Sequence, residues 1–85
     1  MKIGLLWFES DKKKTIEKRV LEAAEYYFKK HGVCSDYCQI PLGTLDPRMN
    51  GEIQVGEIRV VEHKGIPKEH LWIGLDHEVK ENKDE

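Results

Sequence analysis

Only one segment of this 85-residue sequence has the residue spacing of a helix, and this limits the fold more than any other feature. From residue 16 onward, apolar residues recur every three or four positions, with glutamates and lysines between them. The apolar residues are Ile16, Val20, Ala23, Ala24, Tyr27 and Phe28. Gly32 follows a run of basic residues, which is typical of a helix end. We therefore expect one long helix, packed on a strand through Val20, Tyr27 and Phe28.

Five other segments have the length and composition of strands. In chain order they are "KIGLLWF", "DYCQIPL", "EIQV", "IRVVE" and "HLWIGL". An almost unbroken apolar run such as the first is typical of a strand covered on both faces. Between the third and fourth, Gly56 and Glu57 predict a two-residue hairpin turn that places Val55 opposite Ile58.

The element order therefore predicts an α+β fold, β-α-β-β-β-β, with a mixed sheet and one long helix packed on one face. Residues 1–75 are expected to form a single domain, and 76–85 a charged, flexible tail. The first strand, the helix and the second strand should form a right-handed crossover with parallel strands. The hairpin and the last strand should then extend the sheet antiparallel.

The composition is that of a soluble globular protein, with 39% hydrophobic residues, 35% charged residues and a net charge of -2. This charge argues against a general nucleic-acid binder, which usually has a basic excess. No apolar run is long enough to span a membrane, and no signal peptide is recognisable. We expect a cytoplasmic protein without a cofactor and without a membrane partner.

Three segments carry a family resemblance: "KIGLLWF" at the start, "AAEYYFKKHG" at the helix end and "HLWIG" near the close. With them, the chain resembles a group of short uncharacterised bacterial proteins. These proteins share the opening strand, the Tyr-Tyr pair before a basic residue and glycine, and the closing histidine-aromatic-Ile-Gly strand. The resemblance supports the fold and implies no activity.

The segment "HGVCSDYC" holds both cysteines, Cys34 and Cys38, beside a histidine. Zinc sites use closely spaced cysteine pairs, but they require two further ligands, and no second pair is present. A redox pair usually has two intervening residues at a helix start, whereas this pair follows a helix end. We expect a structural corner, with a metal site at Cys34 and Cys38 as the alternative.

Near the end of the fourth strand, Glu62 and Lys64 form an acidic-x-lysine pair, and Asp46 lies upstream. Metal-dependent nucleases use such a set, in which carboxylates hold Mg²⁺ and the lysine stabilises the attacking water or the phosphate. In a chain this rich in charge, the pair also arises by chance. A small metal-dependent hydrolase using Asp46, Glu62 and Lys64 is therefore one alternative.

A run of lysines, Lys12, Lys13 and Lys14, precedes the helix, and Ser10 or Asp11 could cap that helix. Cations beside the free N–H groups of a helix start make an anion or nucleic-acid site conceivable. A charge run is more often a solvated face. A nucleic-acid-associated protein is thus a second alternative.

His70 and Trp72 alternate along the last strand, and the hairpin carries Arg59 on the corresponding face. Aromatic residues and arginine are enriched at protein interfaces. One helix cannot cover both faces of the predicted sheet, so the second face must be buried elsewhere. We expect a non-enzymatic interaction protein that forms a homodimer, with Trp72 at or near the contact, and binds a further, unidentified protein.

Overall fold

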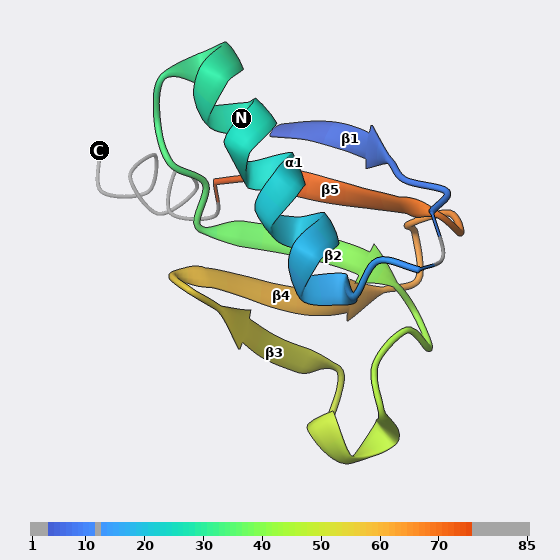
Figure 1. Ribbon diagram of the computed structural model, residues 1–85. Helices are drawn as coiled ribbons and strands as arrows, with labels where there is room; N and C mark the ends of the chain where they lie inside the picture. The colour runs from blue at the N-terminus through green and yellow to red at the C-terminus, as the bar shows by residue number, and fades with distance from the viewer. Residues whose placement is uncertain (1–3, 12, 76–85) are drawn as a thin grey trace.

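The computed structural model describes residues 4–11 and 13–75, so Lys12 and the predicted tail, 76–85, lie outside the described residues. The elements are β1 (Gly4–Phe8), α1 (Ile16–His31), β2 (Tyr37–Pro41), the 3₁₀ helix η1 (Pro47–Met49), β3 (Glu52–Val55), β4 (Ile58–His63) and β5 (His70–Gly74). α1 lies across one face of the sheet (Figure 1). The α+β class and the order of the elements are those that the sequence predicts.

The five strands are ordered β1-β5-β2-β4-β3 across the sheet. β5 pairs antiparallel with both β1 and β2, so these two strands run parallel to each other without touching. β4 pairs with β2 in parallel, and β3 pairs with β4 antiparallel. The prediction that the hairpin extends the sheet antiparallel is therefore wrong, because the hairpin joins β2 through a parallel pair. β5 is antiparallel, as expected, but it lies inside the sheet.

The register of the β3–β4 hairpin is the predicted one. Val55 pairs with Ile58 and Gln54 with Arg59. Gly56 has a φ of 59°, the positive value that the first central residue of this turn type requires. The pairing places Val55 and Ile58 together in the core, where both are buried.

α1 begins later than Ser10 or Asp11 would place it. Thr15 is the N-cap, and its hydroxyl accepts a hydrogen bond of 3.1 Å from the backbone N–H of Lys18. The lysine run therefore precedes the helix instead of forming its first turn. Gly32 ends the helix in the left-handed conformation, with its N–H donated to the carbonyl of Phe28, as predicted.

The buried stripe of α1 is narrower than the sequence spacing suggests. Val20, Ala23 and Tyr27 are fully buried against the sheet. Phe28 is 50% exposed, so the prediction that its side chain packs against a strand is wrong. Consecutive helical residues are separated by about 100° around the axis, and Tyr27 already occupies the core-facing position.

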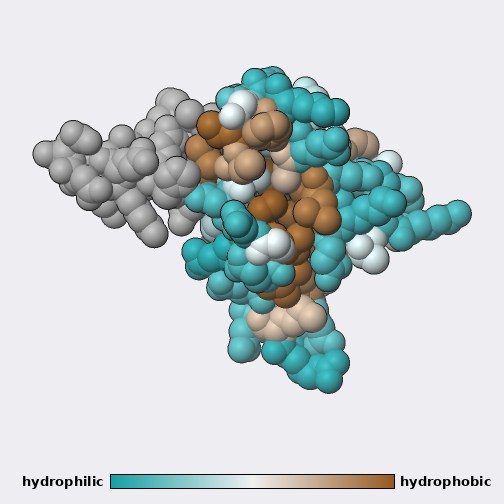
Figure 2. Space-filling model, turned by 60° about the vertical axis from the view of Figure 1, so that its left-hand side comes forward, coloured by the Kyte–Doolittle hydropathy of each residue, from teal (hydrophilic) through white to brown (hydrophobic). Residues whose placement is uncertain are grey.

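The core lies between α1 and the sheet, and alternate residues of the strands build it. The fully buried strand residues are Cys38, Ile40, Val60 and Ile73. Two apolar areas remain outside this core. One is the face of the sheet opposite α1. The other is a hydrophobic band beside the helix, which Figure 2 shows between hydrophilic regions.

Candidate interaction surface

The face of the sheet that α1 leaves uncovered, here called the open face, is the main candidate site. Its side chains alternate with those of the core along each strand. They include Leu6 and Phe8 of β1, Tyr37 and Gln39 of β2, Glu52 and Gln54 of β3, Arg59 and Val61 of β4, and His70 and Trp72 of β5. The face thus contains all three predicted interface residues, Arg59, His70 and Trp72.

Trp72 lies near the middle of the row that joins β1 to β2. It pairs with Leu6 on one side and Gln39 on the other. Its indole lies over Gly4, where a β-carbon would overlap the six-membered ring. A glycine in an apolar strand is costly, and here the close approach of an aromatic ring accounts for it.

The Tyr37 ring lies between Trp72 and Arg59 and contacts both side chains. The Tyr37 ring meets Trp72 edge-on, with 6.1 Å between the ring centroids. The Arg59 guanidinium carbon lies 5.8 Å from the Tyr37 ring centroid, within the range of a cation–π contact. Arg59 also donates from Nε to a Glu52 carboxylate oxygen at 2.7 Å. These contacts hold the aromatic side chains in one arrangement, which lowers the entropy lost on binding.

The large exposed apolar side chains of the open face lie on β1. Leu6 is 52% exposed and Phe8 is 58% exposed. The Phe8 ring lies 5.0 Å from the ring of His70, centroid to centroid. Large apolar side chains gathered on one face of a small protein mark an interaction site more often than scattered ones do.

From the sequence, Leu6 and Phe8 were predicted only as part of the strand "KIGLLWF", and Tyr37 was missed as a member of this surface. In β1, every residue is apolar or glycine, so the strand has no alternation to show which residues face out. Tyr37 sits at the first position of β2, where the boundary with the preceding loop hides its direction.

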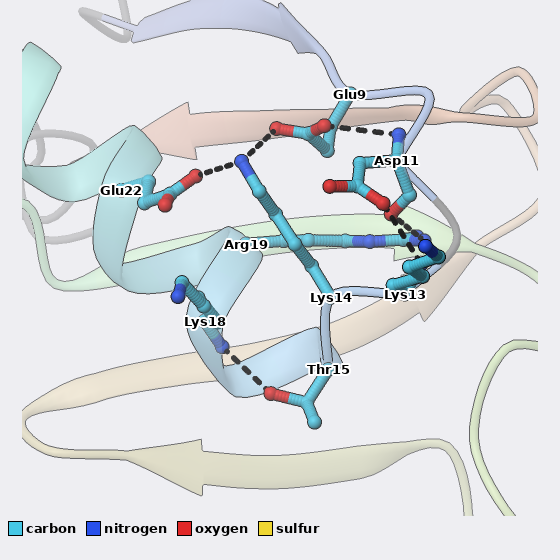
Figure 3. Close-up of polar contacts among 8 residues, drawn as sticks. All are labelled: Glu9, Asp11, Lys13, Lys14, Thr15, Lys18, Arg19 and Glu22. Atoms are coloured by element: carbon cyan, nitrogen blue, oxygen red, sulfur yellow. Dashed lines mark hydrogen bonds and ion pairs between the residues drawn. The ribbon is translucent and has the colours of Figure 1, made fainter.

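Of the lysine run, Lys14 lies between two carboxylates (Figure 3). Lys14 Nζ lies 3.1 Å from a Glu9 oxygen and 2.7 Å from a Glu22 oxygen. The backbone N–H of Lys13 donates to Asp11. Glu9 directly follows β1, and Glu22 lies in α1. Lys14 therefore links the segment between β1 and α1 to the helix.

The pKa values of this cluster agree with an ion-paired lysine. Hydrogen bonds to Glu22 and Glu9 raise the pKa of Lys14. The backbone N–H of Asp11, with Lys14, lowers the pKa of Glu9. Both changes favour the charged forms at neutral pH. The positive charge of Lys14 is therefore matched locally, and the cluster does not favour nucleic-acid binding.

The structure places Asp46 and Glu62 in separate structural roles. Asp46 is the N-cap of η1 and binds Arg48, which lowers the pKa of its carboxyl. Glu62 accepts a hydrogen bond of 2.6 Å from the backbone N–H of Leu45. Lys64 is exposed in the turn after β4. Within residues 4–11 and 13–75, no group of three or more His, Cys, Asp or Glu side chains is arranged to hold a metal ion.

The two cysteines lie in different environments. Cys34 is exposed in the loop after α1, whereas Cys38 is fully buried in β2. Burial raises the pKa of the Cys38 thiol to about 12. The thiolate is the form that binds metals and exchanges disulfides, so Cys38 is poorly suited to either role.

The thiols should therefore differ in reactivity. With a disulfide reagent at mildly alkaline pH, we expect one thiol, Cys34, to react at once in the native protein. Cys38 should react at least about 10-fold more slowly, because its thiolate is disfavoured and shielded. Cys34→Ser should abolish the fast phase, and denaturant should make Cys38 react quickly. Two equally fast thiols in the native protein would contradict this assignment.

Comparisons with family models, with curated proteins and with solved structures find no match. The resemblance to the group of short bacterial proteins therefore stays a prediction. None of the helices in the described part of the chain has the length and apolar character needed to cross a membrane. The case for a function rests on the surfaces described above.

Proposed function

We propose that this chain is a small, non-enzymatic cytoplasmic interaction protein that forms a homodimer through its open face, with Trp72 at or near the contact. The observation that carries this proposal is the open face, which α1 leaves uncovered and on which Leu6 and Phe8 are more than half exposed. Each apolar face of a layered protein is normally buried against another layer. A second copy supplies that layer with a self-complementary surface.

The size of the open face sets the expected strength of the dimer. Five strands about 4.8 Å apart, each about five residues long at 3.3 Å per residue, cover roughly 400 Å² in projection. Stable interfaces bury about 800 Å² of accessible surface per partner, and accessible surface exceeds projected area. Most of the face must therefore take part, and we expect a dissociation constant in the micromolar range.

The β1 edge adds a second reason for self-association. β1 is an outer strand, and the described part of the chain pairs with only one of its edges. Its sequence, GLLWF, has neither a charge nor a proline. Monomeric proteins usually protect such edges with charges, prolines or bulges. An unprotected edge beside Leu6 and Phe8 fits a contact that covers this side of the sheet.

The two alternatives receive less support. The nucleic-acid alternative depends on the lysine run, in which Lys14 is matched by two carboxylates. The hydrolase alternative depends on Asp46 and Glu62, whose carboxylates bind Arg48 and the backbone of Leu45. The contacts of Lys14 do not favour a basic surface. The contacts of Asp46 and Glu62 do not favour a reactive centre.

Sedimentation at micromolar concentration tests the homodimer. We expect a dimer for the wild-type chain, and we expect Leu6→Lys to raise the dissociation constant by about 10-fold or more, because a buried charge replaces an apolar contact. Trp72→Ala should also weaken the dimer. The matched control is Leu21→Lys, since Leu21 is exposed to the same degree but lies on α1.

A single wild-type species at the monomer mass of 9.9 kDa would contradict the proposal. A dimer that Leu6→Lys and Trp72→Ala leave unchanged would place the interface elsewhere on the molecule. Circular dichroism of each variant establishes that the fold is retained.

A further inference from the structure

A second apolar surface lies on the other side of the molecule, between α1 and the turn of the β3–β4 hairpin. It is a groove of about 390 Å³, here called the helix groove. Its principal lining residues are Leu21, Ala24, Phe28, Ser35, Val55 and Ile58. Sites for small ligands and short segments typically measure about 300–1,000 Å³, so the groove has room for one or two large side chains.

The helix wall of this groove is an exposed apolar stripe. Leu21 is 53% exposed and Phe28 is 50% exposed, with the smaller Ala24 between them. These positions share one side of α1, because residues three, four and seven apart lie close together on a helix. The stripe is distinct from the buried one. Figure 2, turned toward the side of the molecule that bears the hairpin turn, shows the hydrophobic band here.

Ser35, one of the lining residues of the groove, has a buried hydroxyl without a partner among the described residues. Ser35 is only 5% exposed, and its Oγ makes no hydrogen bond within residues 4–11 and 13–75. Buried hydroxyls in native proteins are almost always hydrogen-bonded, because an unmade bond costs the full desolvation of the group. A ligand with a polar group beside its apolar part would satisfy Ser35.

The charges that line the groove are acidic. Glu25 contributes from α1 and Glu57 from the hairpin turn, and no basic residue lines the groove. Lys29 lies 3.5 Å from Glu25, but both side chains are about 70% exposed, so water screens this pair strongly. Glu57 has no ion pair within the described residues. The rim therefore attracts cations and repels acids.

We propose that the helix groove binds a short peptide segment of a partner protein, one that presents a large apolar side chain next to a lysine or arginine. The apolar side chain enters between Leu21 and Phe28, and the basic group contacts Glu25 or Glu57. If the Ser35 side chain turns toward the groove, the peptide backbone supplies a donor or acceptor to its hydroxyl. A fatty acid or another apolar anion fits less well, because its head group would face both glutamates.

A titration followed by amide NMR spectra tests this site with two capped tetrapeptides, Lys-Leu-Phe-Lys and Glu-Leu-Phe-Glu. We expect the basic peptide to bind with a dissociation constant of about 0.1–1 mM, which is ordinary for so small a ligand. It should shift the amide signals of Leu21, Phe28, Ser35 and Gly56. The acidic peptide should bind about 10-fold more weakly or not at all, because like charges oppose its approach.

Matched variants separate this site from the dimer contact. Leu21→Lys should abolish binding of the basic peptide, and Glu57→Gln should weaken it by about 2- to 5-fold through the lost charge. Leu6→Lys should leave peptide binding unchanged, whereas it weakens the dimer. Phe28→Ser provides a second groove variant if Leu21→Lys is poorly folded.

Equal binding of the two peptides would overturn the proposal. So would signal shifts confined to the open face around Leu6 and Trp72. Binding that survives both Leu21→Lys and Phe28→Ser in folded protein would do the same. These results are independent of whether the chain dimerises, since the two surfaces lie on opposite sides of the sheet.

Discussion

Replacing Ile73 with alanine is expected to lower the free energy of unfolding by about 2–5 kcal/mol, because a fully buried aliphatic side chain is removed and a cavity remains. Ile73 is 0% exposed and lies in β5, where it pairs with Leu5 of β1 and Cys38 of β2. Small domains have a total stability of about 5–15 kcal/mol. Urea unfolding, followed by circular dichroism, measures the loss.

The control for this variant is Leu42→Ala. Leu42 is 67% exposed in the turn after β2, so it loses little buried area on truncation, and we expect a change within about 0.5 kcal/mol. Ile73→Val should fall between the two, at about 0.5–1.5 kcal/mol. If Ile73→Ala cost no more than Leu42→Ala, β5 would not be the centre of the core.

Adding a single methyl group at Gly4 should destabilise the protein by about 1–3 kcal/mol, the usual cost of overpacking. The β-carbon of Gly4→Ala overlaps the indole of Trp72, so the ring must move off β1. We expect a loss measurable by urea unfolding and a changed Trp72 fluorescence signal. Because Trp72 lies on the open face, the same change should weaken the dimer.

A second substitution tests the cause directly. Trp72→Leu removes the ring that the new methyl group meets, so Gly4→Ala should cost less in that background. The difference between the two costs is the coupling energy, which for contacting residues is about 0.5–3 kcal/mol. Gly65→Ala is a matched glycine control, since its β-carbon meets only the ring of the exposed His63. Equal costs in both backgrounds would mean that Gly4 is needed for another reason.

The features that the sequence predicted correctly depend on neighbours along the chain. The hairpin register follows from Gly56, because a two-residue turn determines which residues face each other. The helix end follows from Gly32 for a similar local reason. The helix start was misplaced because Ser10, Asp11 and Thr15 are all good caps. The ion pairs of Lys14 with Glu9 and Glu22 depend on the folded arrangement, so the helix propensities of the residues do not predict them.

The features that the sequence did not predict depend on which strands become neighbours. Nothing in "HLWIGL" shows that β5 lies between β1 and β2. Without that order, Trp72 could be assigned to a face but not placed beside Leu6 and Tyr37. The helix groove was missed for the same reason. Its two walls come from α1 and the hairpin, which only the folded chain brings together.

The interior position of β5 has a consequence for how the chain folds as it is made. Of the five strands that the structure describes, β1 leaves the ribosome before the others and β5 after them, yet β5 is the one described strand that pairs with β1. Pairs between segments so distant in sequence form slowly, since a long loop must close first. During synthesis, the apolar segment GLLWF therefore stays unpaired until β5 has emerged from the ribosome. Nascent chains cut short before β5 should be the species that chaperones capture.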